Sequence, residues 1–417
     1  MVKKKTKNQK MRVFYNKAIF GKEEIDAINK VLQGFMIVGG DNTKEFEKKI
    51  ARMFGKKYGV MVSSGSSANL IAFELLNLPK GSEVITPIVT FGTTISPIYQ
   101  KGLVPAYVDV EQDTYQINVS QVKEMITKKT KALMVPSLFG NIPDLPALAK
   151  IAKKYKLFLI EDSCDTLGAR INGKPTGVYS DITTTSFFAP HVITTGGHGG
   201  MICINRGEWV EGARVLIGWG RSSARGEIGR SSVKDVSESI SARFDIDLDG
   251  IPYDRKFVFE TLGYNFLPSE IDAAFGLAQL KKFNKFKTIR KKNFAKLLGF
   301  IKKYEEFFVL PKQNPHADTC WLAFPLIVKD KAPFNRRDLV IFLEENGIQT
   351  RPVFTGNALR HSAFKNLKAK KRKGGYPIAD LIMRGSFVVG CHHGMDDAQV
   401  TYVTEKFEEY IKDHTKS

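Results

Sequence analysis

The sequence lacks the features that mark secreted and membrane proteins. Only four cysteines occur in 417 residues, and their spacing matches no CxxC pair or other metal-ligand pattern. No run of about 18 uncharged apolar residues is present, and no apolar stretch follows the lysines of MVKKKTKNQK, which argues against a membrane span and a signal peptide. This pattern favours a reducing compartment, so we expect a cytoplasmic protein with no membrane partner.

Acidic residues are scarce relative to basic ones. The 43 Asp and Glu residues stand against 63 Lys and Arg, which gives a formal net charge of +20. Such an excess suits nucleic acid, an anionic small substrate or a lysine-rich solvated surface. The two densest basic runs, residues 1–10 and 365–373, contain no aromatic residue that could stack on bases. We therefore expect a mobile tail and a solvated loop, and no nucleic-acid partner.

Apolar segments of strand length alternate with helical periodicity in the first half of the chain. Hydrophobic residues make up 43% of the sequence, which is enough for a large core. Strands that alternate with helices predict an α/β fold with a mostly parallel sheet covered by helices, and such sheets bind ligands beyond the carboxyl ends of their strands. The predicted strands span residues 59–62, 84–87, 105–110, 132–136 and 158–162, and the clearest helices span residues 22–32, 43–54 and 145–155.

The alternation of predicted strands and helices weakens between residues 206 and 255. A helix with Ser269 as its N-cap follows. A strand over 321–328, a helix over 335–346 and a strand over 386–390 then predict a smaller α+β unit. We predict a basic tail of residues 1–13, a large domain of residues 14–275 and a small C-terminal domain of residues 276–417.

The segment SSGSSAN, residues 63–69, joins a predicted strand to a predicted helix. Gly65 allows close backbone approach, and Ser66 and Ser67 place amides and hydroxyls at a helix N-terminus, where the dipole favours an anion such as phosphate. A tight capped turn without a ligand is the alternative.

Carboxylates end the strand in EDSCD. Glu161, Asp162 and Asp165 lie where a ligand crevice is expected, and a buried carboxylate there would pair with a cation such as a protonated pyridine nitrogen. A surface cap of the next helix is the alternative.

A third segment, residues 183–205, surrounds His191 and His198 with hydroxyls and glycines. Glycines allow close approach to a bound group. A single histidine, however, packs or forms hydrogen bonds more often than it catalyses.

In this order the segments resemble the sugar aminotransferases of the DegT/DnrJ/EryC1/StrS family, which have the fold-type I architecture and use pyridoxal phosphate. The resemblance extends over nearly the whole chain. It includes SSGSSANL, ITPIVTFGTT, VPAYVDVEQDTYQI, EDSCDTLGA, TSFFAPHVITTGGHGGM and LGYNFLPSEIDAAFGLAQL.

The resemblance implies a set of cofactor-binding residues and a homodimer with shared sites. Phe91 would stack on the pyridine ring, Asp162 would pair with the ring nitrogen, and Asp165 would lie near the ring hydroxyl. The residues implied at the cofactor phosphate are Gly65, Ser66, Ser67, Ser186 and, from the neighbouring subunit, Asn265.

One departure from the family pattern decides the expected chemistry. The aminotransferases read roughly SFxPTK, and their lysine bonds covalently to the cofactor, whereas TSFFAPH places His191 at that position. An imidazole cannot form that stable bond, which leaves acid–base chemistry. This looks like the subgroup of nucleotide-sugar 3-dehydratases, which read SFxPAHH and use pyridoxamine phosphate.

The subgroup implies a substrate and a reaction. A nucleotide-linked 4-keto-6-deoxyhexose would lose its C3 hydroxyl in deoxysugar biosynthesis, such as that of lipopolysaccharide O-antigens, with His191 as the acid and base and glutamate as the amino donor. A nucleotide-sugar aminotransferase-like protein of altered chemistry is an alternative. Arg221, in GWGR, is the candidate for a substrate phosphate or carboxylate, because its planar fork suits such groups.

Some members of the subgroup carry a four-cysteine iron–sulfur cluster and depend on a reductase. Cys164 aligns with the first cluster position, but Ser223 and Arg225 occupy the next two, and a cluster needs about four ligands. We therefore expect no cluster, with a reductase-coupled dehydrase as the alternative. The second histidine of PAHH is Val192 here, and His198 either compensates for a missing acidic residue or has no role.

Overall fold

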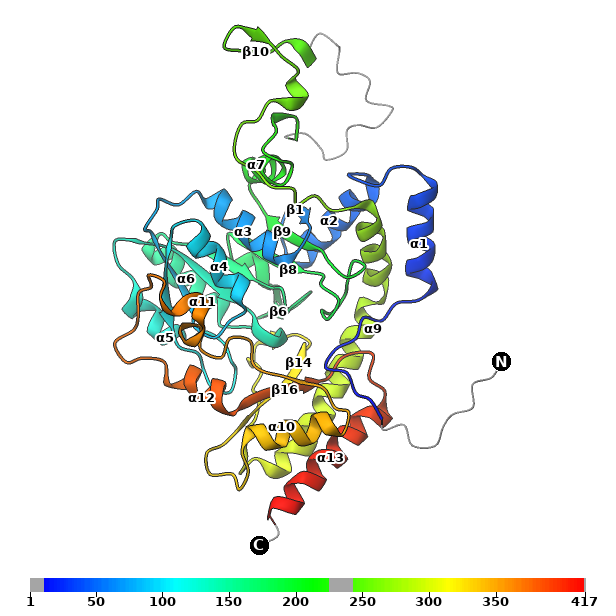
Figure 1. Ribbon diagram of the computed structural model, residues 1–417, viewed down its shortest axis with the longest axis vertical. Helices are drawn as coiled ribbons and strands as arrows, with labels where there is room; N and C mark the ends of the chain where they lie inside the picture. The colour runs from blue at the N-terminus through cyan, green and yellow to red at the C-terminus, as the bar shows by residue number, and fades with distance from the viewer. Residues whose placement is uncertain (1–10, 225–242, 416–417) are drawn as a thin grey trace.

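The computed structural model describes residues 11–224 and 243–415 (Figure 1). Within these ranges no helix is both long enough and apolar enough to cross a membrane. The predicted N-terminal tail lies mostly outside them, because residues 1–10 are not described.

A seven-stranded sheet forms the centre of the larger part of the molecule. Its strand order is β1-β9-β8-β5-β4-β2-β3, and only β9 runs against its neighbours, so the predicted mostly parallel α/β fold is confirmed. The strands are β1 (Tyr58–Val62), β2 (Glu83–Pro87), β3 (Val104–Val108), β4 (Thr130–Pro136), β5 (Phe158–Asp162), β8 (Ile182–Ser186) and β9 (Gly200–Ile204).

Helices cover both faces of this sheet (Figure 1). Alternate residues of each strand point to opposite faces, so Met134 and Ile160 pack in a cluster with α3, while Leu133 and Leu159 pack in one with α6. The surrounding helices are α1 (Lys22–Gln33), α2 (Asp41–Met53), α3 (Gly65–Leu76), α4 (Gly92–Gln100), α5 (Val119–Val122), α6 (Leu145–Tyr155) and α7 (Gly207–Ile217), and a small sheet of β13 (Ala317–Asp318), β6 (Arg170–Ile171) and β7 (Lys174–Pro175) lies beside them.

A second, antiparallel sheet carries the C-terminal part. Its order is β12 (Phe308–Val309), β14 (Ala323–Val328), β16 (Ser386–Gly390) and β15 (Thr350–Arg351). Its helices are α9 (Glu270–Ile301), α10 (Arg336–Glu345), α11 (Ser362–Lys365), α12 (Pro377–Gly385) and α13 (Asp397–Thr415). The helix α9 runs unbroken through residue 275, and the predicted domain boundary there stays a prediction.

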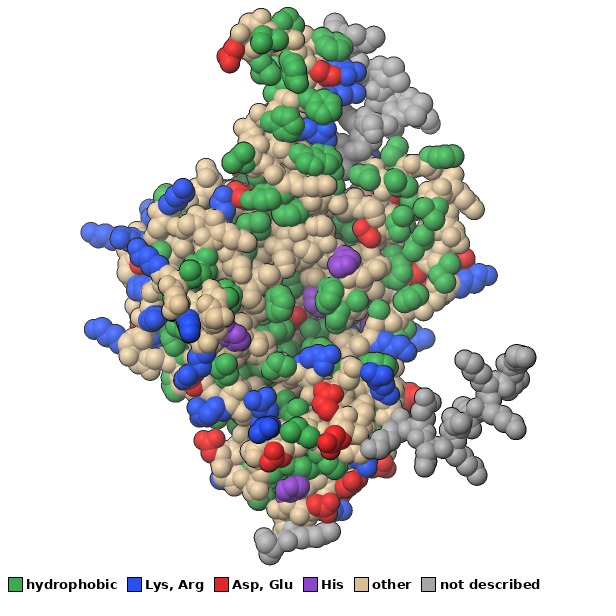
Figure 2. Space-filling view, in the orientation of Figure 1, with side chains coloured by type: hydrophobic (Ala, Val, Ile, Leu, Met, Phe, Trp, Pro, Cys, Tyr) green, Lys and Arg blue, Asp and Glu red, His purple; other side chains and the backbone are tan. Residues whose placement is uncertain are grey.

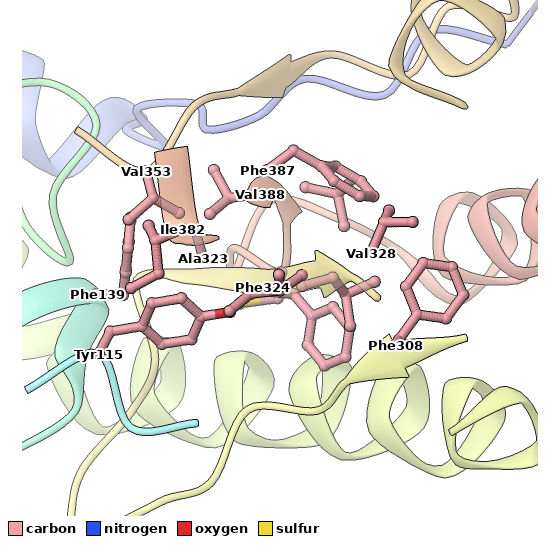
Figure 3. Packing of buried hydrophobic residues seen from close by; sticks show 14 of the residues in the cluster. Tyr115, Phe139, Phe308, Ala323, Phe324, Val328, Val353, Ile382, Phe387 and Val388 are labelled. Carbon is pink, nitrogen blue, oxygen red and sulfur yellow. The ribbon is translucent and has the colours of Figure 1, made fainter. Parts of the chain in front are cut away.

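One apolar core joins the two sheets. Tyr115 and Phe139, which precede and follow β4, lie in the same cluster as Phe324 of β14 and Val388 of β16 (Figure 3). All four side chains are at most 2% exposed, so burial of this contact area favours a fixed placement of the two parts.

An arm projects from the large sheet after α7 (Figure 1). It includes β10 (Asp247–Leu248) and β11 (Ile251–Pro252), and bridges from Gly218 to Asn265 and from Arg221 to Phe259 close its base. Hydrophobic side chains gather on its surface in Figure 2. The exposed hydrophobic residues of this segment include Ile251, Phe257, Phe259 and Leu262, of which Leu262 is 93% exposed.

The basic run 365–373 is not a solvated loop along its whole length. Lys370 pairs with the edge of β3, since its amide donates to the Pro105 carbonyl at 2.9 Å and its carbonyl accepts from the Tyr107 amide at 3.1 Å. Its Nζ also donates to the Met125 carbonyl at 2.7 Å. The solvated-loop prediction is therefore wrong at Lys370, where the run covers an open sheet edge.

A buried glutamate joins α9 to the start of α2. Glu270 is 2% exposed, and its carboxylate accepts hydrogen bonds from the backbone amides of Gly40, Asn42 and Thr43 at 2.8, 3.0 and 2.9 Å. The side chains of Asn42 and Thr43 donate to the same carboxylate. The first amides of a helix have no partner within the helix, so this carboxylate supplies the cap that Gly40 cannot.

We expect Glu270→Gln to lower the free energy of unfolding by about 2 kcal/mol. The NH₂ group of the new side chain would face backbone amides of α2 that are themselves hydrogen-bond donors. Urea unfolding followed by circular dichroism measures the change. The matched control is Glu45→Gln on α2, whose pair with Lys49 is exposed and should change stability by less than about 0.5 kcal/mol. Equal effects of the two substitutions would contradict the capping role.

Candidate active site

The first part of the site is the junction of β1 with α3. The hydroxyl of Ser64 accepts from the Ser67 amide at 3.0 Å and so caps the helix that begins at Gly65. A Cβ atom at Gly65 would lie 2.6 Å from both Cys164 Sγ and Ser186 Cβ. Only glycine fits there, and the predicted phosphate residues Gly65 and Ser186 are neighbours.

The serines of this turn divide into two groups. Ser66 is exposed and its hydroxyl donates to Thr93 at 2.8 Å, whereas Ser67 is buried and its hydroxyl bonds with Ser63 and Ser64 at 2.9 and 2.8 Å. The N-terminus of a 12-residue helix therefore presents the Ser66 side to an open space, which suits an anion.

A buried carboxylate, Asp162, lies at the end of β5 and is 5% exposed. Its Oδ2 accepts from Asn69 Nδ2 at 2.9 Å and from Thr94 Oγ1 at 2.8 Å, and its Oδ1 accepts from the Cys164 amide at 3.2 Å. Among the described residues it has no ion pair, and no helix starts directly after it, so the surface-cap alternative is wrong. A buried charge of this kind fits a cationic ligand group.

His191 follows β8 in a tight turn, and its amide donates to the Phe188 carbonyl at 2.8 Å. Its Nδ1 lies 3.1 Å from the Ser186 carbonyl, which can only accept, so Nδ1 carries a proton and Nε2 of the neutral ring has a free lone pair. Burial lowers the pKa of His191 to about 4. The imidazole is therefore a neutral base at pH 7.

Asp165 lies beside this base, with Oδ1 3.8 Å from His191 Nε2. Its Oδ2 accepts from the Phe139 amide at 2.9 Å. Burial, and to a smaller extent the charge of Asp162, raise the pKa of Asp165 to about 7. Asp165 therefore changes protonation near neutral pH, beside an imidazole that is already neutral there.

Phe91 stands at the N-terminus of α4 and is 54% exposed. Its ring meets the Phe354 ring edge-on at 5.9 Å, and Phe354 stacks on Phe139 at 4.6 Å. One side of the Phe91 ring is thus supported by Phe354 from the C-terminal part of the chain, and the exposed part can stack on a flat ligand.

The structure does not bring the other candidates into this group. The Arg221 guanidinium lies 4.3 Å from the ring centre of Trp219 on the arm, and Asn265 is exposed at the base of the arm. His198 is exposed, and its ring centre lies 6.2 Å from that of Phe188.

The side chains that donate hydrogen bonds to the Asp162 carboxylate were not predicted from the sequence. Asn69 and Thr94 bind Asp162, and Asn69 Oδ1 accepts from Thr184 at 2.6 Å. The sequence contains a signal for Asn69, because it is a large polar residue among the small and apolar residues on the buried face of α3.

The described residues fit an aromatic cofactor that bears a phosphate. The glycine turn and Ser66 suit the phosphate, Phe91 suits a flat ring, and Asp162 suits a protonated ring nitrogen. Within the described ranges, no group of three or more Cys, His, Asp or Glu side chains could hold a metal ion. Ser223 donates to the Lys256 carbonyl at 3.3 Å, and Arg225 lies outside those ranges.

Comparison with known proteins gives consistent matches along the chain. Residues 18–408 match the model of the DegT/DnrJ/EryC1/StrS aminotransferase family. A dTDP-4-dehydro-2,6-dideoxy-D-glucose 3-dehydratase of Saccharopolyspora spinosa is 35% identical over 410 residues, which cover 94% of this chain and 85% of that protein.

Two solved structures of GDP-4-keto-6-deoxymannose 3-dehydratase are similar along their whole length. The Escherichia coli enzyme with bound hydrated pyridoxal phosphate has a TM-score of 0.83 at 30% identity, over 95% of this chain and 100% of that one. A structure with a trapped pyridoxal phosphate–glutamate geminal diamine has a TM-score of 0.83 at 28% identity, with the same coverage.

We expect Asp165→Asn to make stability less dependent on pH. Because the pKa of this acid is raised in the folded chain from 3.8 to about 7, folding favours the protonated form, and its stabilising effect is lost as pH rises between those values. Relative to the native chain, the variant should gain on the order of 3 kcal/mol of unfolding free energy between pH 5 and pH 8. Urea unfolding across that range measures it, and parallel pH profiles would contradict the raised pKa.

Proposed function

The chain belongs to the DegT/DnrJ/EryC1/StrS aminotransferase family, and from that premise we propose that it removes the C3 hydroxyl of a nucleotide-linked 4-keto-6-deoxyhexose with the help of pyridoxamine phosphate. His191 carries the proposal. It stands in the TSFFAPH segment where the aminotransferases have their cofactor-binding lysine, and an imidazole cannot make that stable covalent bond. A half-buried neutral base in that place favours proton transfer over lysine-dependent transamination.

The surrounding side chains would hold the cofactor. Gly65, Ser66, Ser67 and Ser186 would form the phosphate end, Phe91 would stack on the ring, and Asp162 would keep the ring nitrogen protonated, with Asp165 beside the ring hydroxyl. When bound, the cofactor supplies an amine that condenses with the C4 ketone and a ring that accepts electrons.

Nε2 of His191 is the proton carrier in this proposal. Its lone pair is free because Nδ1 keeps its proton toward the Ser186 carbonyl. Nε2 takes up a proton early in the reaction and delivers it to the departing C3 hydroxyl, which leaves as water. Asp165, 3.8 Å away, would stabilise the imidazolium formed between these two steps.

We infer glutamate as the amino donor that restores pyridoxamine phosphate, without an iron–sulfur cluster. A similar enzyme has been trapped with a pyridoxal phosphate–glutamate adduct, which supports the donor. The named relatives differ in nucleotide, since one acts on a dTDP sugar and another on a GDP sugar. The nucleotide is therefore left to experiment, and the cytoplasmic location stays a prediction.

A homodimer with shared sites is part of the proposal. The arm exposes Ile251, Phe259 and Leu262 at 64, 60 and 93%, and a patch of this kind marks an interaction surface. Asn265, at the base of the arm, would reach the cofactor phosphate of the partner subunit. Arg221, on the same arm, would bind a substrate phosphate or carboxylate.

The test of the reaction is incubation with pyridoxamine phosphate, glutamate and dTDP-, GDP-, CDP- or UDP-linked 4-keto-6-deoxyhexoses. We expect a 3-deoxy sugar and 2-oxoglutarate from at least one nucleotide, detected by mass spectrometry. An amino sugar as the main product would make the protein an aminotransferase, and no product from any sugar with the cofactor bound would also contradict the proposal.

We expect His191→Asn to lower kcat by about 10²–10⁴-fold, because the general acid and base is lost. Cofactor absorption should be retained, since the phosphate and ring contacts remain. His316→Asn is the matched control, because His316 is exposed in the loop before β13. A His191→Asn variant of native kcat would remove the assigned role.

Mixing two inactive variants tests the shared site. A dimer of one His191→Asn subunit and one Asn265→Ala subunit contains one site with neither substitution, if Asn265 acts across the interface. Random reassociation should then restore about a quarter of native activity, since half of the dimers are mixed and each has one intact site. If Asn265 acted within its own subunit, every site would carry one defect and mixing would restore nothing.

A further inference from the structure

Arg290, in the middle of α9, is a cation buried without a counter-charge. It is 0% exposed, and among the described residues no carboxylate pairs with it. Its Nη1 donates to the carbonyls of Leu322 and Trp321 at 3.0 and 3.5 Å, and its Nε donates to His393 Nδ1 at 3.1 Å. A buried unpaired charge costs several kcal/mol, so stability alone would favour an apolar side chain here.

The remaining contact of this guanidinium leads to the candidate active site. Arg290 Nη2 donates to the main-chain carbonyl of His191 at 3.4 Å. On the preceding peptide, Asn16 donates to the Pro190 carbonyl. The turn that carries the imidazole is therefore held by α9 and by the N-terminal segment, in addition to its own internal bonds.

The groups around Arg290 do not neutralise it. His393 Nδ1 accepts a hydrogen bond from Arg290 Nε, and the ring is neutral, since burial and the arginine lower the pKa of His393 to about 2. Burial raises the pKa of the Cys320 and Cys391 thiols, so they are uncharged as well. A positive charge in such a low-dielectric interior acts on neighbouring groups with little screening.

We propose that Arg290 is a positioning residue for His191, which fixes the main chain of that residue and uses its unpaired charge to keep the imidazole a neutral base. The role rests on the proposed function, in which His191 transfers protons. The charged groups near the imidazole are Arg290 from α9, Asp162 at the end of β5 and Asp165 in the segment after that strand. The Tyr15 phenol also lies near Asp165 and Arg290. Arg290 opposes protonation of the ring, whereas Asp162 favours it.

The test is a titration of His191 by NMR in the full chain without cofactor or sugar. The chain has seven histidines, and the His191 signal is the one that His191→Asn removes. In the native protein we expect a pKa of about 4, and in Arg290→Met a rise part of the way toward the ordinary 6.5, since burial, the larger cause, remains. The matched control is Arg214→Met, which removes a mostly buried arginine paired with Glu47 and should leave the His191 pKa unchanged.

A second variant separates position from charge and covers a failure of Arg290→Met to fold. Arg290→Lys keeps the charge but cannot reach all of the carbonyls with one nitrogen. We expect the His191 pKa to stay low and the carbonyl carbon signal of His191 to move, with kcat reduced and KM unchanged. An unchanged His191 pKa in a folded Arg290→Met, or an unchanged carbonyl signal in Arg290→Lys, would overturn the proposal. Neither signal depends on turnover, so a failed dehydration assay would leave the test intact.

Discussion

The buried carboxylate of Asp162 is the constraint on which the site depends. A carboxylate at 5% exposure is tolerable only if its oxygens accept hydrogen bonds, and its donors come from α3, α4 and the turn after β5. Satisfying it brings the start of α3 and the start of α4 to one place. Phe91 is the N-cap of α4, three residues before Thr94, so the bond from Thr94 to the carboxylate also fixes the end of the helix that carries this aromatic residue.

In the proposed function, one side chain on this frame, His191, sets the chemistry of the site. A lysine in the place of His191 would bring a flexible cation, whereas the imidazole is locked by its bond to the Ser186 carbonyl and kept neutral by burial. A site with lysine and a site with histidine at this position could hold an anionic aromatic ligand with the same surrounding residues. They would differ in the group that reacts. In the proposed function, fold and reaction therefore have separate causes, since the sheet supplies the frame and residue 191 would supply the reactive group.

Local patterns in the sequence predicted the elements that form by local rules. The strand 158–162 and the helix 145–155 coincide with β5 and α6, and Ser269 does cap α9. The strand β8 was missed because its residues ITTTS are polar for a buried strand, and their hydroxyls bond to groups such as Glu161 and Asn69 that are distant in sequence. The roles of Arg290 and Lys370 were missed for the same reason. Their partners lie far away along the chain, so these contacts produce no local sequence pattern.

The net charge of +20 gives a poor guide to where charge acts. Many lysines lie on the surface in exposed pairs, such as Lys292 and Lys296 with Asp397, and water and salt screen such pairs. Arg290 is one of 63 basic residues, yet it is buried beside the His191 turn, and no carboxylate of residues 11–224 or 243–415 pairs with it. A charge in that setting acts far more strongly than one in water. If His191 transfers protons as proposed, the charge that acts on it is this buried arginine rather than the excess of lysines on the surface.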